Sequence, residues 1–158
     1  MTLFCQSTLY AEVKIAYFDL NYVLDKSNVG LKILKKLDSL NSTNLKKLNQ
    51  KKDEINKENI EIDKIKNVIS EEELKIKINK QKEKIKEYNE LKISLSNKIN
   101  NTKNEEVQEL VKKIKPFLES YIKENSIDII LRKESIYLSK SKYDITKEIL
   151  EIVNKKLK

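Results

Sequence analysis

The chain has 158 residues, of which 37% are charged and 39% hydrophobic, and its formal net charge at pH 7 is +8. One Gly and one Pro leave few turn-forming residues, so we expect a long helix or a coiled coil rather than a compact globule. The absence of His and the single Cys5 remove the commonest general base, an internal disulfide and a thiolate metal site. We therefore expect no enzyme, no metal and no other cofactor.

Residues 1–11 differ from the rest of the chain because they carry no charge, and Ala11 precedes Glu12 like the end of a secretory signal peptide. A complete signal would have a basic start and a longer apolar stretch. We interpret residues 1–11 as a signal-peptide remnant, with a native N-terminal segment as the alternative. No run of about 18 apolar residues follows, so no membrane-spanning segment is expected.

The first predicted element is a strand over residues 13–20, which is rich in β-branched and aromatic residues on both faces. Residues 21–26 predict one or two helical turns. Ser27 and Asn28 then offer a cap for a following helix.

Helical periodicity begins at Val29, and apolar residues recur at seven-residue steps from Leu48 through Ile69. A seven-residue step is typical of one helix lying along another. Polar residues stand where a second apolar row would be expected, so this first arm should pack weakly. The polar residues are Lys52, Asn59 and Lys66.

The hairpin tip is predicted near residues 66–70, because Ser70 and Glu73 form a capping-box pattern that starts a second helix. Three glutamates in its first turn suit the helix dipole, which explains them without catalysis. The second helix has a seam at Leu74, Ile78, Ile85, Tyr88, Leu95 and Ile99, with interruptions at Gln81 and Lys92. We expect residues 100–102 to be a soft spot in a continuous helix and Pro116 to lie at a bend.

After Ser126 the period changes to two, which predicts strands over residues 127–131 and 135–138. A last helix over residues 147–157 would be capped by Asp144 or Thr146. The fold class is mostly α with a small β part: a long antiparallel helical hairpin on a sheet with three strands per chain. We place a single domain over residues 12–158, with arms at 29–117 and a body at 12–28 and 118–158. So thin a core makes an oligomer the expected state.

Two segments carry a resemblance to a known family. The opening KIAYFDLNYVLDKS and the ending SIDIILRKESIYLSKSKYDITKEILEIVNKKL resemble the first and last elements of the Skp/OmpH periplasmic chaperones. The resemblance runs from about Lys14 to the C-terminus, although the middle would match many coiled coils. It implies a homotrimer whose strands close into a small β-barrel, with three hairpin arms around a cavity.

The same resemblance implies a function. Family members are ATP-independent holdases in the periplasm of Gram-negative bacteria, and they keep unfolded outer-membrane β-barrel proteins from aggregating. The core of the trimeric body would then contain apolar residues from all the predicted strands: Ile15, Tyr17, Phe18, Ile127, Ile129, Leu131, Ile136 and Leu138. The family's proposed lipopolysaccharide site depends on basic positions, including Arg, that are not matched here.

A run of lysines just beyond the tip is the candidate client-binding site: Lys75, Lys77, Lys80, Lys82, Lys84 and Lys86. A cationic arm end would attract acidic client segments or an anionic membrane surface. The alternative is a solvated helix face. Because Arg132 is the sole Arg, nucleic acid is not an expected partner. A structural or adaptor coiled coil without chaperone activity is the second functional hypothesis.

Overall fold

A computed structural model describes residues 13–157, so Cys5 and the predicted signal remnant lie outside the described part of the chain. The chain divides into two compact units. Of the described residues, the body unit contains 13–32 and 108–157, and the hairpin unit contains 33–107. The elements in chain order are β1 (Ile15–Phe18), α1 (Leu20–Lys26), α2 (Asn28–Ile65), α3 (Glu71–Asn125), β2 (Ile129–Arg132), the 3-10 turns η1 (Lys133–Ser135) and η2 (Ser141–Tyr143), and α4 (Thr146–Lys156).

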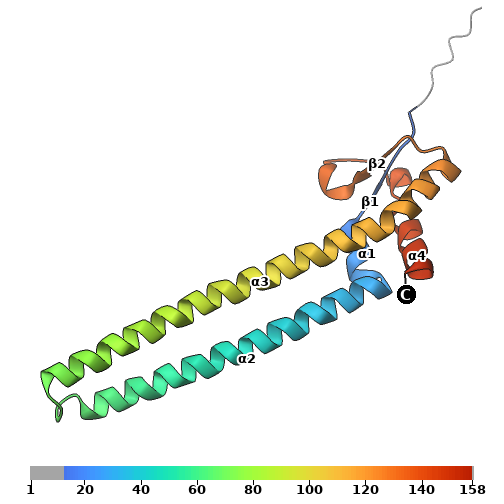
Figure 1. Ribbon diagram of the computed structural model, residues 1–158. Coiled ribbons are helices and arrows are strands. Elements are labelled where there is room, and N and C mark those ends of the chain that lie inside the picture. Colours follow the sequence, from blue (N-terminus) through green and yellow to red (C-terminus); the bar gives the residue numbers. More distant parts are fainter. Residues whose placement is uncertain (1–12, 158) are drawn as a thin grey trace, which may run out of the picture. The chain divides into compact units, whose positions relative to one another are not determined.

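The body unit holds a two-stranded parallel sheet in which β1 pairs with β2, from Ile15 opposite Ile129 to Phe18 opposite Arg132. Parallel neighbours need a long crossover connection, and here that connection contains both long helices (Figure 1). The best-buried side chains of this unit come from α1, α3 and α4: Val23, Leu110, Ile114, Ile149 and Val153. These aliphatic side chains form the core against which β1 packs.

The predicted first strand is shorter in the structure, because Asp19 ends it and caps α1. The Asp19 carboxylate accepts a 2.9 Å hydrogen bond from the Tyr22 backbone N–H, as an N-cap residue does. One element later, Ser27 Oγ accepts from the Gly30 N–H at 3.0 Å at the start of α2. The predicted cap at Ser27 is confirmed.

The predicted strand over residues 135–138 is wrong for the single chain. The segment starts with the last residue of η1, closed by a 3.0 Å bond from the Ile136 N–H to the Lys133 carbonyl. Tyr137 and Leu138 follow without a partner strand in the described part of the chain, and they are 104% and 87% exposed. A strand needs a neighbour to satisfy its N–H and C=O groups, and one chain supplies none here.

In the hairpin unit, α2 and α3 run side by side in opposite directions, and residues 66–70 join them (Figure 1). The predicted capping box is confirmed: the Glu73 N–H donates to Ser70 Oγ at 3.3 Å, and the Ser70 N–H donates to Glu73 Oε2 at 3.4 Å. The α3 helix is continuous through residues 100–102, as predicted, and through Pro116.

The seam of α3 differs from the prediction between residues 81 and 92. Ile85 is exposed, whereas Lys84 and Leu91 lie at half-buried seam positions. Two successive three-residue steps, from Ile78 to Gln81 and on to Lys84, rotate the buried row away from Ile85. Lys84 can lie at this half-buried position because its ammonium group forms an ion pair with Glu58 of α2.

Candidate functional site

The body unit presents an open sheet edge. The Ile145 N–H donates to the Tyr17 carbonyl at 2.9 Å, so β1 has a partner on its second side. β2 pairs only with β1 within the described chain, and its Ile129 and Leu131 side chains are exposed. An unpaired apolar edge is a template for a strand of another chain.

The predicted body-core residues fall into two groups. Tyr17, Phe18 and Ile127 are buried within the single chain, and Ile136 is half-buried. The others are exposed: Ile15, Ile129, Leu131 and Leu138. These four exposed side chains are the predicted core residues that the single chain does not bury.

Both predicted cap residues of the last helix take part in one hydrogen-bond chain. Asp144 Oδ1 accepts from the Thr146 N–H at 2.9 Å and also from the Thr146 hydroxyl. That hydroxyl in turn accepts from the Asp19 N–H at 2.9 Å. The N-cap position of α4 is Ile145, which makes no side-chain cap bond, so the predicted cap at Asp144 or Thr146 is displaced. Asp144 still satisfies the N–H of Thr146, the first residue of α4, and Thr146 ties α4 to Asp19 at the end of β1.

Asp19 is a junction that sequence reasoning missed as a structural residue. Its second carboxylate oxygen accepts from Lys133 Nζ at 2.9 Å. This bond, and then the bond from the Tyr22 N–H, hold the pKa of the Asp19 carboxyl below its usual range. The same contact raises the pKa of Lys133. The sequence feature that could have indicated this role is an Asp directly before a helical segment that begins with Leu20.

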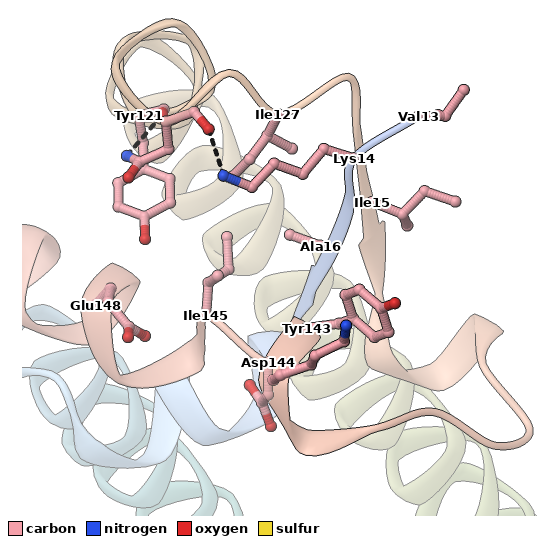
Figure 2. A pocket seen from close by; sticks show the side chains of 12 residues that line it. Val13, Lys14, Ile15, Ala16, Tyr121, Ile127, Tyr143, Asp144, Ile145 and Glu148 are labelled. Carbon is pink, nitrogen blue, oxygen red and sulfur yellow. Dashed lines mark hydrogen bonds between the residues drawn. The ribbon is translucent and has the colours of Figure 1, made fainter. Parts of the chain in front are cut away.

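A pocket of about 490 Å³ lies in the body unit between β1, the end of α3 and the start of α4 (Figure 2). The Tyr121 ring points into it from α3, and Glu148 lies on its α4 side (Figure 2). Burial, and then the charge of Glu148, raise the pKa of the Tyr121 hydroxyl. Lys14 closes another side by donating to the Asn125 carbonyl at 2.7 Å. These contacts are structural, and no group of three potential metal ligands occurs among the described residues.

The structure divides the predicted lysine cluster into two rows on α3. Lys75, Lys82 and Lys86 are spaced by seven and four residues and therefore share one face. Apart from a 3.9 Å contact of Lys86 with Glu90, this row makes no ion pair within residues 13–157. The second row, at Lys77, Lys80 and Lys84, lies toward the acidic residues of α2.

The second row is partly neutralised by α2. Lys77 and Lys80 line a small groove together with Glu58 and Glu61, and Lys84 pairs with Glu58. Moreover, residues 51–90 contain eleven lysines and eleven carboxylates, so the distal hairpin has no net charge. The first row differs from the second in having no carboxylate of α2 among its ion-pair partners within residues 13–157.

Two amide side chains lie in the seam between α2 and α3 without a full set of partners. Asn44 is 4% exposed, and its Nδ2 makes no hydrogen bond within the described chain; the same holds for Gln81 Nε2. Gln81 was predicted as an interruption of the seam, but Asn44 was missed. Its position seven residues after Leu37 could have indicated that Asn44 faces the other helix. Polar seam residues weaken the attraction between the two arms of the hairpin.

The sequence matches a known family over most of its length. The family model described as "Outer membrane protein (OmpH-like)" matches residues 14–153. The chain belongs to the OmpH-like family. None of the described helices is long and apolar enough to cross a bilayer.

Comparison with solved structures gives the same fold. A crystal structure of a candidate outer membrane chaperone (OmpH-like) from Caulobacter crescentus CB15 is similar, with a TM-score of 0.77 at 15% identity. The match covers 98% of this chain and 92% of that chain, and at this identity it concerns the fold. Comparison with curated proteins finds no match.

Proposed function

We propose that this OmpH-like protein is an ATP-independent holdase of the periplasm that binds unfolded outer-membrane β-barrel proteins and prevents their aggregation. Membership of the OmpH-like family supports the proposal, as does the fold it shares with the Caulobacter protein. The observation that carries it is the hairpin unit, whose arms keep aliphatic side chains exposed. The most exposed are Leu45, Ile60, Val68, Ile76 and Ile93.

Such arms suit a client that has no fixed shape. Each exposed aliphatic side chain offers a small apolar contact, and many weak contacts give tight capture while each remains exchangeable. The row of Lys75, Lys82 and Lys86 would attract acidic client segments. Because no phosphate-binding loop is recognisable in the sequence, capture and release would be an equilibrium without nucleotide.

We infer that the active form is a homotrimer, with the body units joined through their strands. The exposed edge of β2, with Ile129 and Leu131, supports this assembly. The segment around Tyr137 and Leu138 would gain a partner there that one chain does not supply. The arms of three chains would then surround one client.

The deciding experiment dilutes an unfolded outer-membrane barrel out of denaturant with and without this protein, in the absence of ATP. We expect stoichiometric suppression of light scattering. Unchanged aggregation at an excess of protein would overturn the holdase function and favour an adaptor coiled coil. Sedimentation of the protein alone should give three times the 18.6 kDa chain mass, and a stable folded monomer would contradict the trimer. Leu131→Lys, at the exposed edge, should lower that mass, with Leu45→Lys as the control.

A further inference from the structure

The middle of the hairpin unit is almost without charge. Residues 39–45 of α2 contain no charged residue, and residues 93–102 of α3 contain one, Lys98. In the rest of the hairpin unit, more than half of the residues are charged. We call these two stretches together the neutral belt.

The two stretches lie at the same level of the hairpin. Ion pairs join Lys36 to Glu106 and Glu58 to Lys84, and in both pairs the residue numbers add to 142. This register places residues 39–45 opposite residues 97–103. The two stretches therefore lie at one level along the hairpin, on its two neighbouring helices.

The belt carries exposed aliphatic side chains among amides and hydroxyls. Leu45 is 51% exposed on α2, and Ile93 is 62% exposed on α3. Two grooves, of about 710 and 460 Å³, adjoin on α3, and both are lined by Ile93 and Asn97. Their other walls contain uncharged polar residues, including Ser94, Ser96 and Asn101, together with Lys98 of the belt and three charged residues that border the belt in the chain: Glu90, Lys92 and Glu105.

This chemistry fits one kind of ligand. An extended polypeptide presents backbone N–H and C=O groups, and Asn side chains can both donate to and accept from them. Covering the belt buries few charges, so the desolvation cost is much lower than elsewhere on the arms. Ile93, which lines both grooves, can contact an apolar side chain of such a segment. A charged segment would lose hydration here and would find opposite charges only at Lys98 and at the bordering residues Glu90, Lys92 and Glu105.

We propose that the neutral belt is the surface that binds extended, uncharged segments of the unfolded client, while charged segments are left to the ends of the arms. This inference rests on the proposed holdase function and names the class of segment that the middle of the hairpin takes. A second copy of this chain is the competing occupant.

The test compares two exposed isoleucines of the same helix. Ile93 lies in the belt, whereas Ile76, 67% exposed, lies among the lysines near the tip. Binding of a soluble fluorescent peptide built of Leu, Ser, Thr and Asn is measured by anisotropy. Ile93→Asn should weaken its binding about tenfold, as expected for the loss of a buried aliphatic contact, and Ile76→Asn about twofold or less. A matched peptide with Glu and Lys in place of Ser and Thr should bind both variants alike.

A charge variant tests the same surface independently. Asn97→Glu puts a carboxylate into both grooves and should weaken binding of the neutral peptide, whereas Asn79→Glu near the tip should not. If Ile93→Asn and Ile76→Asn weaken binding of the neutral peptide equally, or if Ile93→Asn does not weaken it, the neutral belt is not its binding surface. A change in sedimentation mass for Ile93→Asn would also overturn it in favour of contact between copies. If the wild-type protein suppresses barrel aggregation and the variants bind the neutral peptide as well as it does, only the proposed role of the neutral belt is contradicted. If the wild-type protein does not suppress aggregation, the holdase function itself is contradicted.

Discussion

Lys133 Nζ donates a 2.9 Å hydrogen bond to Asp19 Oδ2 and so joins two residues 114 positions apart in the chain. Asp19 ends β1 and caps α1, and Lys133 directly follows β2. The contact therefore fastens the far ends of both strands to each other and to the first helix.

The first prediction concerns acid stability. Because the pKa of Asp19 is lowered in the folded state, its stabilising effect is complete above the unfolded value, about 3.9, and is lost as pH falls through the lower folded value. The pKa of Lys133 is raised in the folded state, so its contribution to stability is lost only at alkaline pH, as pH rises through its folded-state pKa. Asp19→Asn should therefore destabilise the protein more at pH 7 than at pH 3.

Urea unfolding followed by circular dichroism at the two pH values measures this difference. Asp19→Ala is the useful companion, because it also removes the helix cap and should cost about 1 kcal/mol more than Asn does. Equal destabilisation by Asp19→Asn at pH 7 and pH 3 would show that the ion pair contributes nothing.

The second prediction concerns the buried amide in the hairpin seam. Asn44→Leu removes an unpaired buried N–H group, whose burial costs about 1–3 kcal/mol, and should stabilise the hairpin by an amount in that range. Hydrogen exchange of the α2 amides should slow accordingly. Asn41→Leu, at an exposed position of the same turn, should leave the exchange rates unchanged. A destabilised Asn44→Leu would mean that the seam has no room for an aliphatic side chain.

The third prediction distinguishes the two rows of lysines. Replacing Lys75, Lys82 and Lys86 by Gln should slow association with an acidic unfolded client at low salt without changing stability. Replacing Lys77, Lys80 and Lys84 removes the same number of charges but should slow association less, because Glu58 and Glu61 already offset them. Stopped-flow fluorescence measures both rates.

Salt is the internal control for these variants. The Debye length is about 8 Å at physiological ionic strength, so the difference between the triple variants should shrink as salt is added. Identical rates for the two variants at low salt would show that the rows act as one diffuse charge.

The fourth prediction concerns Gly30, the sole glycine of the sequence. Ala normally stabilises a helix relative to Gly by about 1 kcal/mol. Here a Cβ would lie 1.9 Å from the Leu24 carbonyl oxygen, which belongs to backbone and cannot rotate away. Gly30→Ala should therefore destabilise the body unit, by about 1–3 kcal/mol or more. An increase in the thermal midpoint would show that the turn between α1 and α2 adjusts freely.

Sequence patterns predicted the elements wherever local chemistry decides them. Ser70 with Glu73, and Ser27, mark helix starts through contacts a few residues away, and the structure has those contacts. The seam near Lys84 was predicted wrongly because an apolar residue was preferred to a lysine, whereas Glu58 on the other helix decides the outcome. That partner is 26 residues away and leaves no local signal.

The strand predicted over residues 135–138 shows the same limit on a larger scale. Its alternation of Ile136 and Leu138 is a genuine strand pattern, yet a strand forms only where a neighbour completes its hydrogen bonds. For the lysine run, the sequence indicated the charge, but the division into two rows depends on which face of α3 lies against α2. Helix rotation of this kind follows from packing and not from composition.

The parallel pairing of β1 with β2 has a consequence for the order of folding. Ile15 meets Ile129, so β1 leaves the ribosome long before its partner exists and has to remain unpaired until α3 is complete. Contact between Lys36 and Glu106 at the base of the hairpin then reduces the open chain between the strands to residues 19–35 and 107–128. Loop-closure entropy makes this worth about 1 kcal/mol. The hairpin should thus form first and favour the later pairing of β1 with β2. A chain interrupted before residue 129 would be left with β1 unpaired and prone to aggregate.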